Sequence, residues 1–329
     1  MGIRIIGVGK YIPPMFETSE VVAARLNIPV EEIIRMTGIE KRHLAGDESA
    51  SSMGHKALGE AIESSCVNKD DIDGVIVATF TGDYLFPSTA LKLVQSQDLE
   101  AGLAFDLMAS CAGMQTAIEN ARSLLFSNHG LKIIAVVGIA KQSPYVNQYD
   151  ENSAFFFGDA ASAVLIRRDG TAPEEGFLPS YFNSITKNYE LVRLRCGCSS
   201  FPINSSSLEL ESKARYYEHS GLGVWKEVVV ELPKIIRSSL ADLKWEIDDL
   251  DLILFHQANL RLIEYCMSRL KLPMSKSVNN VSTIGNTAEA SIGTVIYDAF
   301  RAGHLGKNKK ILLVSMGAGF MYAVTPYYG

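Results

Sequence analysis

Three side chains of different chemical types could act together in nucleophilic chemistry: Cys111, His256 and Asn286. Cys111 follows an apolar run and precedes a predicted helix over residues 114–125. A thiol at a helix N-terminus faces free backbone N–H groups and the positive end of the helix dipole, which favour the thiolate. His256 follows the apolar run 252–255, and Asn286 lies in a Gly-Asn-Thr turn. These residue types indicate acyl transfer through sulfur.

Each of the three residues also has a purely structural interpretation. A free cysteine is often a small buried hydrophobe, and a histidine at a strand end can bond a backbone carbonyl. An asparagine after glycine is typical of a turn or a helix cap. Catalysis is favoured because all three stand at reactive turns in matching positions of two similar segments.

A weak internal duplication defines those two segments. Residues 70–78 read as an acidic motif followed by an apolar run, and a similar pattern starts 178 positions later, at residues 248–255. Residues 132–137 have a counterpart at residues 310–315, again 178 positions later. Strand-like runs alternate with helical stretches in both segments, which predicts the α/β class.

Charged and turn-forming residues interrupt the pattern near residue 170. We therefore expect a first half, residues 1–170, that carries Cys111 and a second half, residues 171–329, that carries the histidine and the asparagine. If the halves pack about a pseudo-two-fold axis, the turns at Cys111 and Asn286, 175 positions apart, face one another. The three side chains would then meet where the halves join.

Composition and length limit the function further. The 329 residues carry a net charge of −6, which argues against a nucleic-acid-binding protein. No apolar run approaches the ~18 residues that span a bilayer, and no signal peptide is evident. The five cysteines lack paired zinc-type spacing, so we expect reduced thiols in the cytoplasm and no metal site. Residues 183–217 form a long excursion that is a candidate lid or tunnel wall.

The chain resembles the β-ketoacyl-acyl-carrier-protein synthase III family of thiolase-fold condensing enzymes. The resemblance covers nearly the whole chain and keeps the family's order of motifs. It implies a thiolase fold, in which two similar βαβαβαββ-type halves form a layered αβαβα structure. The matching blocks are Thr37-Gly38-Ile39, Phe86-Pro87-Ser88, Cys111-Ala112-Gly113, Phe157-Gly158-Asp159, His256-Gln257-Ala258-Asn259, Gly285-Asn286-Thr287 and Gly317-Ala318-Gly319-Phe320.

By this resemblance, Cys111 takes an acyl group from a thioester and then receives the enolate formed when malonyl-acyl carrier protein loses CO₂. His256 and Asn286 would donate hydrogen bonds to the enolate oxygen. The backbone N–H groups of Cys111 and Ala318 would stabilise the tetrahedral intermediate. The family implies a cytoplasmic homodimer, acyl carrier protein as partner and phosphopantetheine thioesters as substrates. It implies no metal, no further cofactor, no nucleic acid and no membrane.

The resemblance also assigns residues around the site. Phe86, Met114, Phe157 and Phe320 would line the acyl pocket, with Phe86 reaching across the dimer interface. Arg261 would help to dock the acidic carrier protein. Core packing for Phe86 and a solvated helix charge for Arg261 remain open as alternatives.

Several residues depart from the family pattern, among them Met114 in place of a bulkier Phe and Ala318 in place of a glycine. Glu32 and Glu151 stand where a tryptophan and an arginine hold the adenine of CoA, and Met36 replaces a common arginine. Two acids near the CoA phosphates predict that a carrier protein or another pantetheine thioester delivers the acyl donor, unless these charges are simply solvated. They make specialised, polyketide-like biosynthesis at least as good an interpretation as fatty-acid initiation. For Glu289 we see no role beyond an acid in the first turn of a helix.

Two rival functions stay open. A related acyltransferase without decarboxylation would pass the acyl group of Cys111 to a small-molecule acceptor. A non-catalytic scaffold would keep only the fold and the carrier-protein surface. A degradative thiolase fits less well, because residues 319–322 lack a second cysteine.

Overall fold

The computed structural model describes residues 2–169, 172, 174–202 and 212–329. Its first half has the predicted βαβαβαββ order, and its strands lie in the sheet order β5-β4-β6-β7-β1. The predicted division near residue 170 falls partly on residues 170, 171 and 173, which lie outside the described residues, so it stays a prediction. The elements are β1 (Ile3–Tyr11), α3 (Ala50–Ser65), β4 (Gly74–Ala78), α4 (Thr89–Gln97), β5 (Leu103–Leu107), α5 (Gly113–Ser127), β6 (Ile133–Ala140) and β7 (Ala160–Arg168).

The second half repeats this order with one difference. Its strands are ordered β12-β13-β14 with β9 on the other side of β14, and no strand is described between α7 and α9, where the first half has β5. The short strand β8 (Gly176–Phe177) pairs with both β1 and β14 and so joins the two sheets. The elements are β9 (Tyr181–Ser184), α6 (Gly221–Leu243), β12 (Leu252–Phe255), α7 (Leu260–Leu270), α8 (Val281–Ile284), α9 (Ala288–Arg301), β13 (Lys310–Gly317) and β14 (Met321–Tyr328).

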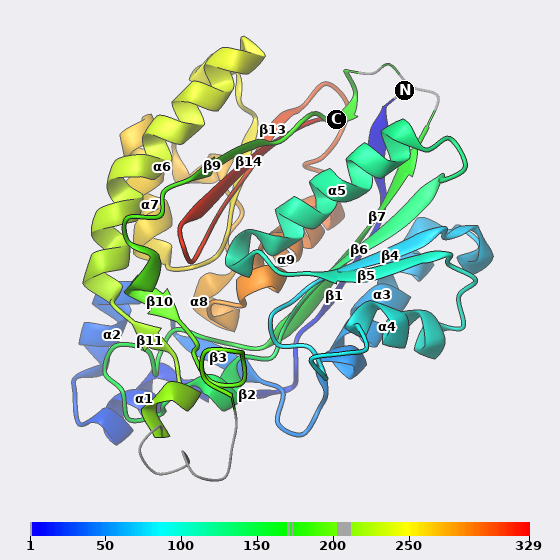
Figure 1. Cartoon of the computed structure of the whole chain (residues 1–329). Coiled ribbons are helices and arrows are strands. Elements are labelled where there is room, and N and C mark those ends of the chain that lie inside the picture. The colour runs from blue at the N-terminus through cyan, green and yellow to red at the C-terminus, as the bar shows by residue number, and fades with distance from the viewer. Residues whose placement is uncertain (1, 170–171, 173, 203–211) are drawn as a thin grey trace.

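The helices and sheets form five layers, which confirms the predicted αβαβα arrangement. Helices α5 and α9 lie between the two sheets, α3 and α4 cover the outer face of the first, and α6 and α7 cover the outer face of the second (Figure 1). Strand β4 shows why helices cover both faces of the sheet. Val75 and Val77 pack with the α3 and α4 side chains, whereas Ile76 packs with those of α5 and α9. This alternation follows from the two-residue period of a strand buried on both faces.

The two central helices pack closely because small residues face them. A Cβ atom on Gly138 of β6 would lie 2.6 Å from the carbonyl oxygen of Glu289, and one on Gly293 would lie 2.5 Å from the sulfur of Met114. Larger residues would push α9 away from β6 and α5. The N-termini of α5 and α9 are thereby held near each other.

Shorter elements complete the molecule near the same ends of the central helices. They are α1 (Ser19–Leu26), α2 (Val30–Thr37), the hairpin of β2 (Met15–Thr18) and β3 (Lys41–Leu44), and the pair β10 (Val192–Arg193) and β11 (Glu218–His219). The predicted excursion over 183–217 includes residues 203–211, which lie outside the described residues. Among the described helices, none combines the length and hydropathy that crossing a membrane requires.

Candidate active site

Cys111 lies in a 3-10 turn, Ser110–Ala112, that connects β5 to α5. Ser110 has a φ of 47°, a left-handed conformation that non-glycine residues adopt at a cost and that is typical of functional turns. The end of β13 packs against this turn at Gly317, where an added Cβ would lie 2.8 Å from the carbonyl oxygen of Ala109. A side chain at position 317 would therefore displace the turn that presents the thiol.

Asn286 occupies the corresponding turn of the second half. Gly285, with a φ of 79°, precedes it as Ser110 precedes Cys111. The Asn286 backbone N–H donates to the carbonyl oxygen of Phe156 at 2.8 Å, and its side-chain Oδ1 accepts from the N–H of Ala288 at 3.0 Å. Because Oδ1 already has this partner, the amide group Nδ2 is the part of the side chain left to donate a hydrogen bond to a ligand.

His256 follows β12 and is fixed through its backbone and its ring. Its N–H donates to the carbonyl oxygen of Val314 at 2.7 Å, and its Nδ1 contacts Oγ of Ser291. The same Oγ accepts the N–H of Gln257 at 3.2 Å, so the Ser291 hydroxyl proton is available for Nδ1. The ring proton is then on Nε2. Burial lowers the pKa of His256 to about 3, which keeps the imidazole neutral.

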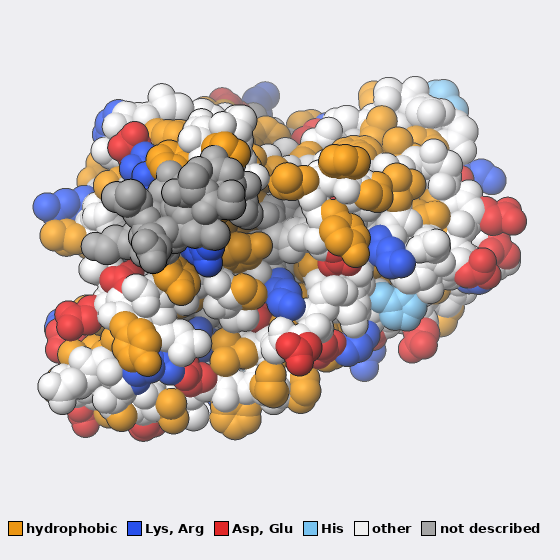
Figure 2. All heavy atoms as spheres, turned by 60° about the horizontal axis from the view of Figure 1, so that its bottom comes forward, with side chains coloured by type: hydrophobic (Ala, Val, Ile, Leu, Met, Phe, Trp, Pro, Cys, Tyr) orange, Lys and Arg blue, Asp and Glu red, His pale blue; other side chains and the backbone are white. Residues whose placement is uncertain are grey.

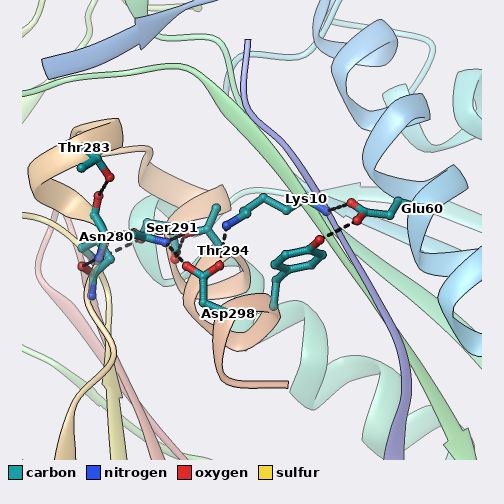
Figure 3. Close-up of polar contacts among 9 residues, drawn as sticks. Lys10, Glu60, Asn280, Thr283, Ser291, Thr294 and Asp298 are labelled. Atoms are coloured by element: carbon teal, nitrogen blue, oxygen red, sulfur yellow. Dashed lines mark hydrogen bonds and ion pairs between the residues drawn. The ribbon is translucent and has the colours of Figure 1, made fainter. Parts of the chain in front are cut away.

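Polar contacts extend from Ser291 to the first half of the chain. Figure 3 shows these residues on α9, at the turn before α8 and on β1. Thr294 Oγ1 donates to the Ser291 carbonyl oxygen at 2.7 Å and accepts from Asn280 Nδ2 at 3.0 Å. Asn280 Nδ2 also donates to Asp298 at 2.8 Å. Asp298 in turn forms an ion pair with Lys10 at 2.5 Å. The residue that orients His256 is therefore held by a network that spans both halves.

Cys111, His256 and Asn286 line one cavity of about 100 Å³. Ala318, Phe157 and Phe320, which the resemblance also placed at the site, line the same cavity. The structure thus brings the predicted nucleophile and the two predicted hydrogen-bond donors together where the halves meet. The remaining lining residues are Phe156, Val192, His219, Gly221, Val224, Trp225, Ala258, Asn259, Leu262, Met316 and Gly317.

The prediction that the helix terminus favours the thiolate is wrong for the unliganded protein. Burial raises the pKa of the Cys111 thiol, and the charge of an ionised Glu289 would raise that pKa further. The thiol packs with apolar groups that include Phe80, Ala140 and Ala290. Desolvation of the thiolate outweighs the dipole, so the neutral thiol is the favoured form.

Other predicted residues lie away from the cavity. Met114 is fully buried in the core between the sheets, and Phe86 is 85% exposed on the connection before α4. Arg261 pairs with Glu264 at 2.9 Å and donates to the Ile34 carbonyl oxygen at 3.1 Å, which ties α7 to α2. The prediction that Met114 lines the acyl pocket is wrong for this cavity, because its side chain faces the core between α5, α9 and β6. The predicted roles of Phe86 and Arg261 depend on a partner molecule.

Sequence reasoning did not identify most of the cavity wall. Val224 and Trp225 come from α6, and His219 comes from β11. Val192 belongs to the predicted excursion and lines the cavity, which agrees with a tunnel-wall role for this part of it. The apolar face of α6 was the available signal, but periodicity does not say which buried residues face a cavity. Within the described ranges, no group of three His, Cys, Asp or Glu side chains is placed to hold a metal ion.

Comparison with known proteins gives a consistent result. The family model for 3-oxoacyl-[acyl-carrier-protein] synthase III matches residues 105–185. A second model, for the C-terminal part of the same enzyme family, matches residues 240–327. The β-ketoacyl-[acyl-carrier-protein] synthase III of Phocaeicola vulgatus is 33% identical over 320 residues, covering 97% of this chain and 94% of the relative. That of Campylobacter fetus is 34% identical over 321 residues, covering 97% and 95%.

Solved structures extend the likeness. The 3-oxoacyl-[acyl-carrier-protein] synthase III of Aquifex aeolicus superposes with a TM-score of 0.89 and 27% identity, over 99% of each chain. The priming β-ketosynthase of the R1128 polyketide pathway superposes with the same TM-score and identity, over 99% of this chain and 96% of that one.

Proposed function

The chain belongs to the 3-oxoacyl-[acyl-carrier-protein] synthase III family of thiolase-fold condensing enzymes, and from this premise we propose how its residues act. The enzyme is an acyltransferase that condenses an acyl thioester with malonyl-acyl carrier protein, with loss of CO₂, in fatty-acid or polyketide-like biosynthesis. The roles of individual residues, the donor and the assembly are the proposals that follow.

In the first step, Sγ of Cys111 attacks the carbonyl carbon of the acyl thioester. The new carbon–sulfur bond forms as the bond to the pantetheine sulfur breaks, and the thiol proton passes to the departing sulfur. The backbone N–H groups of Cys111 and Ala318 hold the oxygen of the tetrahedral intermediate. Because the thiol is protonated in the free enzyme, proton transfer accompanies attack.

In the second step, malonyl-carrier protein loses CO₂ and leaves an enolate. The enolate oxygen accepts hydrogen bonds from Nε2 of His256 and Nδ2 of Asn286. Its carbon attacks the acyl group on Cys111, and the thiolate leaves and is protonated. One observation supports this assignment above others: the second polar atom of each side chain already has a partner. Nδ1 of His256 contacts Ser291, and Oδ1 of Asn286 accepts the N–H of Ala288.

A single assay tests this mechanism against its rival. The purified enzyme is incubated with an acyl thioester and malonyl-carrier protein, while intact mass, CO₂ and product are followed. We expect an acyl adduct on Cys111, then CO₂ and 3-oxoacyl-carrier protein in equal amounts. Transfer of the Cys111-bound group to a small-molecule acceptor without CO₂ would instead identify a non-decarboxylating acyltransferase.

We propose that a carrier protein rather than CoA delivers the first acyl group. Glu32 on α2 and Glu151 before Phe157 are both exposed, and a carboxylate ~4 Å from a CoA phosphate costs up to about 1 kcal/mol in water. Lys and Arg side chains are interspersed with Asp and Glu on the face in Figure 2, which shows no large basic patch among the described residues. Docking of an acidic carrier protein would therefore depend on individual cations, and Arg261 on α7 is our candidate.

We expect acyl-carrier protein to acylate Cys111 at least ~10-fold more efficiently than the matching acyl-CoA. Replacing Glu32 and Glu151 by glutamine should improve acyl-CoA use several-fold at low salt and leave carrier-protein use unchanged. Glu174→Gln is the matched control, because this exposed residue follows the end of β7 that is remote from Phe157. Equal rates with both donors in the wild type would contradict the proposal.

We propose that the enzyme works as a cytoplasmic homodimer. The connection before α4 exposes Tyr84, Leu85 and Phe86 by 71%, 87% and 85%. The N–H of Thr89 donates to Asp106 of β5 at 2.6 Å, so this apolar segment lies beside β5, the last strand of the sheet among those described. Large exposed apolar groups next to the open outer edge of β5 favour association of two copies here.

A further inference from the structure

Glu289 lies in the first turn of α9, which packs against the turn that carries Cys111. It is 0% exposed. Its side chain packs on Gly113, at the start of α5, where an added Cβ would lie 3.2 Å from Glu289 Cγ. Its neighbours Ala288 and Ala290 belong to the same apolar cluster as Phe80 and Cys111. The carboxyl group is therefore an isolated polar group in the apolar surroundings of the thiol.

Neither carboxyl oxygen of Glu289 has a hydrogen-bond partner among the described residues. A buried polar group without a partner lowers the equilibrium constant for folding by roughly 10-fold or more. Such a group in a native structure therefore calls for an explanation. Burial raises the pKa of Glu289 well above its usual value. The backbone amides of Glu289 and Phe80 lie near enough to lower this pKa in part, although neither meets hydrogen-bond geometry. In its protonated form, which burial favours, Glu289 offers one donor and one acceptor.

Two polar side chains of the site, those of Tyr217 and Asn286, already have partners. The Tyr217 hydroxyl donates to Gln142 Oε1 at 3.0 Å. The Oδ1 atom of Asn286 accepts from the N–H of Ala288. Neither of these two groups is free to complete the acid, which is open to a partner that enters with the reaction. The group that the reaction places beside the thiol is the acyl chain on Cys111.

We propose that Glu289 is a specificity-determining residue that selects acyl donors with a hydroxyl group on C2 or C3. This inference rests on the proposed acyl-Cys111 intermediate. A hydroxyl group both donates and accepts, so it can bond the carbonyl oxygen and the acid proton of Glu289 together. A ketone would accept the acid proton but could not donate to the carbonyl oxygen of Glu289. An alkyl chain could bond neither of them. An ammonium group would require an ionised carboxylate, which the apolar surroundings oppose.

The test compares four-carbon thioesters on one carrier protein: butyryl, 3-oxobutyryl, and the 2- and 3-hydroxybutyryl forms as separate enantiomers. Initial rates of Cys111 acylation are measured by intact mass, singly and in competition. We expect the best hydroxybutyryl donor to exceed butyryl by about 10-fold, with 3-oxobutyryl between them, as one or two neutral hydrogen bonds allow.

Two variants at the same position separate hydrogen bonding from shape. Glu289→Gln keeps a donor and an acceptor, so the preference for hydroxybutyryl should survive. Glu289→Leu keeps the volume but removes both polar atoms, so butyryl should become the equal or better donor. Labelling of the leucine variant by butyryl also shows that it is folded.

The outcomes are distinct for the two levels of inference. If the wild type accepts butyryl and hydroxybutyryl equally, or if Glu289→Leu keeps the wild-type ratio, the assignment of Glu289 is wrong while the acyl-enzyme mechanism stands. If no thioester modifies Cys111, the acyl-enzyme mechanism fails and this inference fails with it. The wild-type comparison decides even if a variant does not fold.

Discussion

Replacing Cys111 by alanine should abolish the acyl-enzyme and yet leave decarboxylation of malonyl-carrier protein intact. We expect condensation to fall by roughly 10⁴-fold or more, because the covalent intermediate is lost. The donors for the enolate stay in place. His256 is held by Val314 and Ser291, and Asn286 by Phe156 and Ala288, so none of these described contacts involves the thiol.

Three readouts check this variant: intact mass after incubation with thioester, CO₂ release, and formation of the 3-oxoacyl product. Cys198→Ala is the matched control, since Cys198 is exposed and its loss should change none of them. An acyl adduct that persists in Cys111→Ala would assign the nucleophile to another residue. If Cys111→Ala loses CO₂ release as well as the acyl adduct, decarboxylation needs the acyl group or the thiol.

The convergence of the three site residues was predictable because the duplication relates their turns. Cys111 and Asn286 occupy equivalent positions, each after a residue with positive φ. A pattern repeated at a constant offset places such turns about one axis. The sequence could therefore indicate where the halves would join, although no single one of these residues is distinctive by itself.

Properties that depend on burial by distant residues were not predictable in the same way. The helix position suggested a reactive thiolate at Cys111, whereas desolvation by residues such as Phe80 and Ala140, far away in the chain, raises its pKa. Glu289 looked like an ordinary acid in a first helical turn. Its isolation becomes visible only when β4, α5 and α9 are packed together.

The fold was predicted better than the cavity wall. Alternating strands and helices determined the layers, since each element buries a face whose period can be read from the sequence. The second half has no described strand that corresponds to β5 of the first half. At that place, before α8, residues 277–280 carry Ser and Asn. There Asn280 bonds Asp298 and Gln257 accepts the Asn280 N–H, so side chains replace strand pairing.

Replacing His256 by alanine should produce the opposite pattern to the loss of Cys111. The acyl adduct should still form, because the thiol and the backbone N–H groups of Cys111 and Ala318 remain. CO₂ release and condensation should fall by about 10²–10³-fold, the usual effect of removing one donor from a developing oxyanion. Ser291→Ala should cause a smaller loss, since it frees the ring without removing it.

The pH dependence distinguishes this donor role from general-base catalysis. Because burial lowers the pKa of His256 to about 3, the imidazole is neutral from about pH 5 to 8, and condensation should show no step near the usual histidine pKa of about 6.5. The unfolded state binds a proton near pH 6.5 and the folded state does not, so this histidine destabilises the fold as pH falls from about 6.5 toward 3. His256→Ala should remove that part of the acid sensitivity of unfolding, measured as denaturant midpoint against pH. A condensation rate that rises through pH 6.5 in the wild type and is flat in His256→Ala would show that the imidazole accepts a proton, and the donor role would have to be abandoned.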